Sequence, residues 1–214
     1  IRLPRILLAL CIGAILALSG AVMQGLFRNP LADPSLIGVS SGASVGASLA
    51  IVFAGGLLQA NAWMGLSVVA FSAFAGGLLA TLLVYRLATS EFGTSVTTML
   101  LAGIAIGAIA GSLNGLLGYF SNDALLRQMS IWQMGNLSNA NWSRLLPAAV
   151  ALCVLLVALP RSGLALNALL LGESEARHLG INVQRIKRQL IIVTALGIGM
   201  AVAVAGLIGF VGLV

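Results

Sequence analysis

The sequence predicts an all-α integral membrane protein, a multi-helix bundle that crosses the bilayer several times. Of its 214 residues, 60% are hydrophobic and only 7% are charged, whereas soluble domains carry about 25% charged residues. The apolar stretches are long and lack the polar alternation of transmembrane barrel strands. Because lipid offers the backbone no hydrogen-bond partners, such stretches have to be helical.

Six apolar segments follow one another along the chain, at residues 6–24, 36–56, 62–85, 96–120, 145–160 and 189–214. A helix needs about 20 residues to cross the hydrocarbon core. The second segment is marginal because it is rich in Gly and Ser, and the fifth because it lies between Pro147 and Pro160. We expect short or irregular helices at these two places.

We expect one transmembrane domain over residues 1–214, present as a fragment of about six to seven helices. The chain begins at Ile1 rather than Met and stops at Val214 within an apolar run. The sequence therefore indicates a domain that is incomplete at both ends.

The basic residues of the connections predict an orientation. If six crossings alternate, one side holds Arg2, Arg5, Arg127 and Arg144, and the other holds Arg28, Arg86, Arg161, Arg177, Arg185, Lys187 and Arg188. The second set is larger, so it is expected in the cytoplasm. Residues 161–188 form the most polar connection and are predicted to be a cytoplasmic coupling region. Within it, residues 174–179 are expected to form a short helix closed by Gly180.

Several classes of site are disfavoured by the residues present. The lone Lys187 does not lie in a P-loop pattern, His178 is the only histidine, and Cys11 and Cys153 lie in apolar runs. We therefore expect neither an enzyme nor a metal site. The net charge of +6 lacks the basic stripe with interleaved aromatics that nucleic-acid binding requires.

Ionisable residues at mid-membrane depth usually mark proton or ion pathways. The six apolar segments contain none, because Asp33, Glu91 and Asp123 lie in or beside connections. This argues against a proton-coupled secondary transporter and favours a pathway whose energy comes from a partner. A partner needs a docking element, and residues 172–188 are the candidate.

Three stretches of the sequence resemble one known family. They are Ile1-Arg-Leu-Pro-Arg5 with Ser19–Gly25, Arg28-Asn-Pro-Leu-Ala-Asp-Pro34 and Gly38–Ser44; then Gly172-Glu-Ser-Glu-Ala-Arg-His-Leu-Gly180; and Ala205–Leu213. Together they are similar to the permease subunit of type II ABC importers, which take up haem, ferric siderophores and cobalamin. Haem permeases look closest. The resemblance runs through the whole chain in one order.

The resemblance implies a ten-helix, multi-pass subunit of the bacterial inner membrane, surrounded by lipid and working by alternating access. The implied partners are a second permease subunit (forming a homodimer or near-homodimer), two ATP-binding subunits that hold ATP and Mg, and a periplasmic substrate-binding protein. No cofactor is expected on this chain, and haem or another iron chelate is the implied substrate. A ferric siderophore or cobalamin importer is the alternative, and an ATP-independent secondary transporter or channel is an alternative of another class.

The resemblance also implies roles for residues at both faces of the membrane. The ATPase-coupling helix would comprise Gly172, Glu173, Ala176, Arg177, His178, Leu179 and Gly180. The alternative for this stretch is a solvated amphipathic turn. Arg2 and Arg5 would dock the binding protein, because Arg forms bidentate pairs with carboxylates. Their alternative role is to anchor the helix end at the membrane interface.

A cytoplasmic gate is implied at Thr94, Ser95, Val96, Thr97 and Thr98. The alternative there is N-capping of the following helix by Thr94 or Ser95. Possible pathway residues are Ser40, Ser41, Gly42, Arg127 and Met129. The last two lie near Trp132, Met134 and Trp142, which form either an outer mouth or an interfacial aromatic belt.

Overall fold

The computed structural model describes residues 2–54, 62–91, 93–138, 140–209 and 211. The described helices are α1 (Arg2–Phe27), α2 (Val39–Phe53), α4 (Ala62–Ala88), α5 (Val96–Tyr119), α6 (Asp123–Gln133), α7 (Trp142–Ala158), α8 (Gly163–Leu171), α9 (Glu173–His178) and α10 (Val183–Ala205). Short 3-10 helices cover Pro34–Ile37 (η1) and Pro160–Ser162 (η2). Two-residue strands, β1 (Thr89–Ser90) and β2 (Gly93–Thr94), form an antiparallel hairpin.

The predicted fold class is confirmed. Among the described residues, five helical stretches are long and apolar enough to cross a membrane: Arg2–Phe27, Ser67–Ala88, Val96–Tyr119, Trp142–Leu171 and Val183–Ala205. The second predicted segment forms α2, a shorter apolar helix of 15 residues. Among the described residues, each of the six predicted apolar segments therefore corresponds to an apolar helix.

The fifth segment is longer than residues 145–160. α7, η2 and α8 together form one apolar span of 30 residues. Pro160 does not end it, because the flanking Leu159 and Gly163 keep helical backbone angles. Proline is tolerated in the first turn of a helical element, because a backbone N–H at that position has no hydrogen-bond acceptor within the helix. Residues 163–171, predicted to belong to the polar coupling region at 161–188, therefore lie in an apolar helix.

The sixth segment is shifted relative to residues 189–214. α10 begins at Val183, where the Oδ1 atom of Asn182 accepts a hydrogen bond from the Arg185 N–H at 3.0 Å. It ends at Ala205, before Gly206 with φ +76°. The basic cluster of Arg185, Lys187 and Arg188 therefore belongs to a helix rather than to a loop.

The sequence analysis predicts neither the β1–β2 hairpin nor α6. The stretch after α5 forms α6, whose first turn is capped by Asn122, the Oδ1 atom of which accepts from the Leu125 N–H at 3.0 Å. α6 has 11 residues, too few to cross a membrane. Its buried Met129 anchors it to the rest of the bundle.

Glycines allow the central helices to approach closely. A Cβ atom on Gly42 of α2 would collide with the carbonyl oxygen of Gly76 on α4, and one on Gly46 would collide with that of Ser72. On α5, a Cβ on Gly103 would collide with the carbonyl oxygen of Leu36. Small residues have this packing role in membrane bundles. Gly42, predicted as a possible pathway residue, thus packs α2 against α4.

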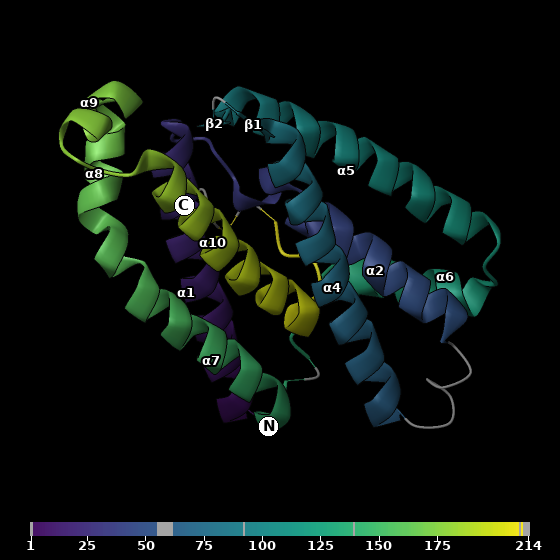
Figure 1. Ribbon diagram of the computed structural model, residues 1–214. Helices are drawn as coiled ribbons and strands as arrows, with labels where there is room; N and C mark the ends of the chain where they lie inside the picture. Colours follow the sequence, from purple (N-terminus) through teal and green to yellow (C-terminus); the bar gives the residue numbers. More distant parts are fainter. Residues whose placement is uncertain (1, 55–61, 92, 139, 210, 212–214) are drawn as a thin grey trace.

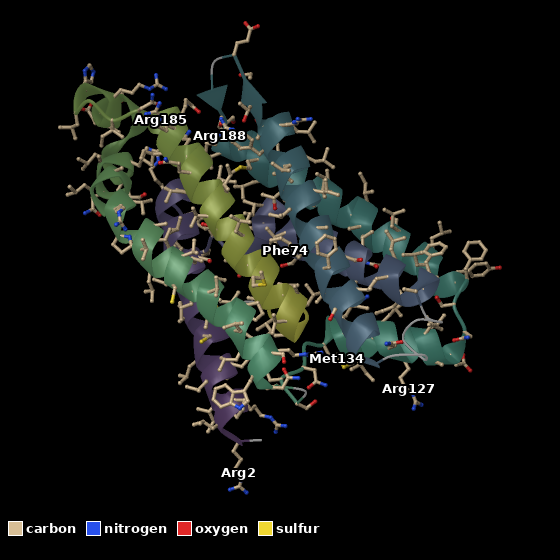
Figure 2. The ribbon with its side chains drawn as sticks, turned by 60° about the horizontal axis from the view of Figure 1, so that its bottom comes forward. Arg2, Phe74, Arg127, Met134, Arg185 and Arg188 are labelled. Carbon is tan, nitrogen blue, oxygen red and sulfur yellow. The ribbon has the colours of Figure 1, made fainter. Side chains whose placement is uncertain are left out.

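The polar features lie at two opposite ends of the bundle (Figure 1). α9 and the β1–β2 hairpin lie at one end, which we call the hairpin end, and the start of α1 lies at the other, which we call the outer end. Figure 2 shows Arg185 and Arg188 at the hairpin end, and Arg2 and Arg127 at the outer end. This separation agrees with the two sides predicted from the charges of the connections.

Candidate functional site

The coupling segment folds as a short helix between two glycines. α9 covers Glu173–His178; Gly172 before it has φ +130° and Gly180 after it has φ +79°. These are backbone angles that glycine adopts most readily. The Gly180 N–H donates to the Arg177 carbonyl at 2.9 Å, which closes the helix. The predicted helix ending at Gly180 is confirmed.

α9 has one face packed inward and one face open. Ala176 is fully buried in a small apolar cluster with Ala168, Leu169 and Val183. Arg177, His178 and Leu179 are exposed, and Leu179 keeps 65% of its surface accessible. An exposed large apolar side chain beside two basic ones is a surface suited to docking a partner.

Glu173 is partnered within the chain by two cations, Lys187 and Arg177. Its Oε1 atom lies 2.5 Å from the Nζ atom of Lys187, and its Oε2 atom lies 3.7 Å from the Nη2 atom of Arg177. The Lys187 side chain is 3% exposed and that of Glu173 31%. A buried ammonium requires an opposite charge and hydrogen-bond acceptors, and Glu173 supplies both.

The predicted gate begins in the hairpin. Thr94 is buried, pairs with Thr89 across the hairpin, and is bound from α10 by two side chains. Its N–H donates to the Oε1 atom of Gln184 at 3.0 Å, and its carbonyl accepts from the Nζ atom of Lys187 at 2.8 Å. Both backbone groups of one gate residue are therefore held by side chains one helical turn apart.

The alternative role for this segment, N-capping, is confirmed for Ser95. Its Oγ atom accepts hydrogen bonds from the N–H of Thr98 at 3.3 Å and from the Thr98 hydroxyl at 3.0 Å. Val96 and Thr97 are the first residues of α5, and Thr97 and Thr98 are exposed. Capping does not exclude a gate, which stays a prediction.

Arg2 and Arg5 lie where a docking partner at the outer end could reach them. Both are exposed in the first turns of α1. The Nη2 atom of Arg5 donates to the Ser138 carbonyl at 2.8 Å, which ties it to the connection between α6 and α7. Arg2 points away from the bundle at this end (Figure 2).

The predicted pathway residues do not gather in one place. Ser40 and Ser41 are half-buried at the start of α2, where the Ser41 carbonyl accepts from the Ser44 hydroxyl at 2.8 Å. Arg127 and Met129 lie on α6; Arg127 is exposed, whereas Met129 is 4% exposed and packs in the core. Met129 therefore does not face an open surface of this subunit.

Lys187 and Gln184 are the site residues that sequence analysis missed. A signal for Lys187 was present, because Val183, Lys187, Leu190 and Ile191 have the spacing of one buried helix face. All four are buried on α10. No group of three or more His, Cys, Asp or Glu residues in the described part of the chain could hold a metal ion.

Comparison with known proteins identifies the family to which this chain belongs. The model of the FecCD transport family matches residues 1–214. The chain belongs to the FecCD transport family. This agrees with the resemblance drawn from the sequence motifs, and it identifies a transport component rather than an enzyme. As a FecCD protein with five candidate spans in the part of the chain that the structure describes, it is a multi-pass protein of the inner membrane.

Curated relatives of this FecCD chain include permeases named for different substrates. It is 46% identical to the hemin transport system permease protein HmuU of Yersinia pestis, with 100% of this chain and 63% of the relative covered. It is 43% identical to the vitamin B12 import system permease protein BtuC of Pectobacterium atrosepticum, with 100% and 62% covered. The chain thus spans less than two thirds of the length of these relatives.

A solved structure supports the same fold for the FecCD chain. It is described as an inward-facing conformation of a transporter assigned to the metal-chelate ABC type. The TM-score is 0.84 at 35% sequence identity, with 100% of this chain and 66% of that chain covered. The arrangement of helices in Figure 1 is therefore that of a known transporter subunit.

Proposed function

We propose that this chain is the permease part of an ATP-driven importer that moves a metal chelate from periplasm to cytoplasm by alternating access. The observation that carries the proposal is the connected polar site at the hairpin end. There, α9 presents exposed Arg177, His178 and Leu179, while its Glu173 is bound through Lys187 to Thr94 in the predicted gate. A partner pressing on α9 would therefore act on a helix already joined to the gate.

The partners follow from the two polar ends. Two ATP-binding subunits, which hold ATP and Mg, would dock against α9 at the hairpin end. A periplasmic substrate-binding protein would dock at the outer end, on the side of Arg2 and Arg5. A second copy of the permease would complete the pathway, and lipid would cover the remaining apolar surface. Among the titratable residues described within the candidate spans, no carboxylate lies at mid-depth, which favours energy supplied by such partners.

Haem is the substrate we propose first, because the relative named for hemin is 46% identical. Cobalamin is the second candidate, since a permease named for vitamin B12 import is 43% identical. A ferric siderophore is the third, on the resemblance of the motifs alone. All three are large chelates that need a wide pathway with few fixed polar groups.

The test is uptake by the complete permease, purified with its ATP-binding subunits and reconstituted in proteoliposomes with the binding protein. We expect haem uptake that requires ATP and exceeds cobalamin and ferric siderophore uptake. Absorbance spectra of the binding protein with each ligand give an independent readout of specificity. Uptake that proceeds without ATP, or a permease that binds no ATPase subunit, would support the secondary transporter or channel instead.

Charge reversal of Arg2 and Arg5 to Glu is expected to weaken docking of the binding protein. An exposed ion pair contributes about 0.2–1 kcal/mol, so the double reversal should raise the Kd by roughly tenfold. The effect should shrink as ionic strength rises, because salt screens exposed charges. Binding to the reconstituted transporter at low and physiological salt measures it.

Arg86→Glu is the matched control, since Arg86 is also exposed but lies in the last turn of α4, at the hairpin end. The single variant Arg2→Glu leaves the hydrogen bond between Arg5 and Ser138 intact, so it measures docking without loss of that contact. If Arg86→Glu weakens binding as much as the outer pair, the effect reflects overall charge and the docking role is wrong.

A further inference from the structure

Lys187 joins three elements that are separate in the sequence. It lies in the second turn of α10, with 2% of its surface exposed. Its Nζ atom is 2.5 Å from Glu173 Oε1 on α9 and 2.8 Å from the Thr94 carbonyl oxygen on β2. One buried ammonium therefore binds α9 and the hairpin at once.

The buried position does not require a charge. Val183, Leu190 and Ile191 occupy the same face of α10 and are apolar, so a methionine would fit the pattern at Lys187. Replacing a buried ion pair with apolar side chains is often neutral or stabilising. The pair is therefore better explained by the specific connection that it makes than by the stability that it adds.

The hairpin is positioned so that displacement of Thr94 reaches α5. Thr94 directly precedes Ser95, the N-cap of α5, and its N–H is bound by Gln184 from the same face of α10. A Cβ atom on Gly93 would collide with the Gln184 side-chain amide, so the hairpin lies directly against α10. Movement of α9 can thus pass through Lys187 to the hairpin and on to the first turn of a membrane-spanning helix.

We propose that Lys187 is a positioning residue that transmits the displacement of α9 to the β1–β2 hairpin, so that α9 and the start of α5 move together. The proposal rests on the proposed function, in which ATPase subunits act on α9. Neighbouring cations do not replace Lys187. Arg177 reaches Glu173 at 3.7 Å but its side chain is 61% exposed, and Arg185 and Arg188 are exposed on the other face of α10.

The first experiment compares Lys187→Met with Arg188→Met in the reconstituted full complex. Both variants remove one positive charge from adjacent residues of α10, but only Lys187 is buried and paired. ATP hydrolysis and substrate uptake are measured in parallel. We expect uptake per ATP hydrolysed to fall at least tenfold in Lys187→Met and to stay within twofold of the parent in Arg188→Met.

Glu173→Gln provides a second route if Lys187→Met does not fold. The amide keeps the shape of the side chain and removes its charge, so the connection weakens without a cavity. We expect the same direction of change, with uptake per ATP reduced about threefold or more. Unchanged uptake per ATP in both folded variants would overturn the proposal.

A distance measurement tests the connection without relying on transport. Spin labels at Glu91 and Ser174, exposed residues of the hairpin and α9, are introduced after Cys11 and Cys153 are replaced. We expect one narrow distance distribution in the parent and in Arg188→Met, and a broader one in Lys187→Met. Equal distributions would overturn the proposal, whereas a parent complex that shows no ATP-dependent uptake would overturn only the proposed function.

Discussion

Replacing Leu179 with aspartate is expected to lower ATP-dependent uptake at least tenfold without unfolding the subunit. Leu179 follows α9 directly and is 65% exposed, so the fold does not depend on its side chain. Burial of a leucine side chain against a partner contributes about 1.5–3 kcal/mol. Loss of that contact, together with the cost of burying an unpaired carboxylate at the interface, exceeds the roughly 1.4 kcal/mol that corresponds to a tenfold change.

The measurement is substrate-stimulated ATP hydrolysis and uptake by the reconstituted complex, with co-purification of the ATPase subunits as a direct readout of docking. Leu87→Asp is the matched control, because Leu87 is 64% exposed in the last turn of α4 but lies outside α9. Leu179→Met should keep most of the parent's uptake activity, since methionine is close to leucine in volume and is also apolar. Equal losses of uptake in Leu87→Asp and Leu179→Asp would show that α9 is not part of the docking site.

The apolar helices were predictable because lipid requires long, internally hydrogen-bonded segments. Their ends were less predictable. The predicted crossings end at Pro160 and begin after the cations at 185–188, yet Pro160 starts a new helical turn and the cations lie in α10. A local signal for breaking a helix is overridden when the neighbouring turns continue to pack and hydrogen-bond.

The site was predictable where it depends on short spacing. Gly172 and Gly180 bound α9 as expected, and Ser95 caps α5. The connection through Lys187 was not predicted, because its two partners lie 14 and 93 residues away. Only the packing of α10 against α9 and β2 brings these groups together. A lone buried lysine on an apolar helix face was the available sequence signal.

The close packing at the outer end of α10 depends on Gly206, and Gly206→Ala is expected to destabilise the protein strongly. Its backbone has φ +76° and ψ −170°, a region essentially restricted to glycine that costs other residues about 1–3 kcal/mol. A Cβ atom there would also collide with the Trp132 carbonyl oxygen and lie 3.0 Å from the Cα atom of Gly135. Both penalties act on the junction where the Asn136 N–H donates to the Ala205 carbonyl at 2.7 Å.

Thermal unfolding of the purified full-length permease measures the effect, with an expected fall in Tm on the order of 5–10 °C. Gly209→Ala is the matched control, because a Cβ on Gly209 meets nothing within 4 Å and its φ lies outside the left-handed region; its Tm should change little. Similar losses in both variants would show that the junction is not the cause. Gly206 lies at the opposite end of α10 from Lys187, so the folded fraction of Gly206→Ala should keep its uptake per ATP. That result would separate stability at the outer end from coupling at the hairpin end.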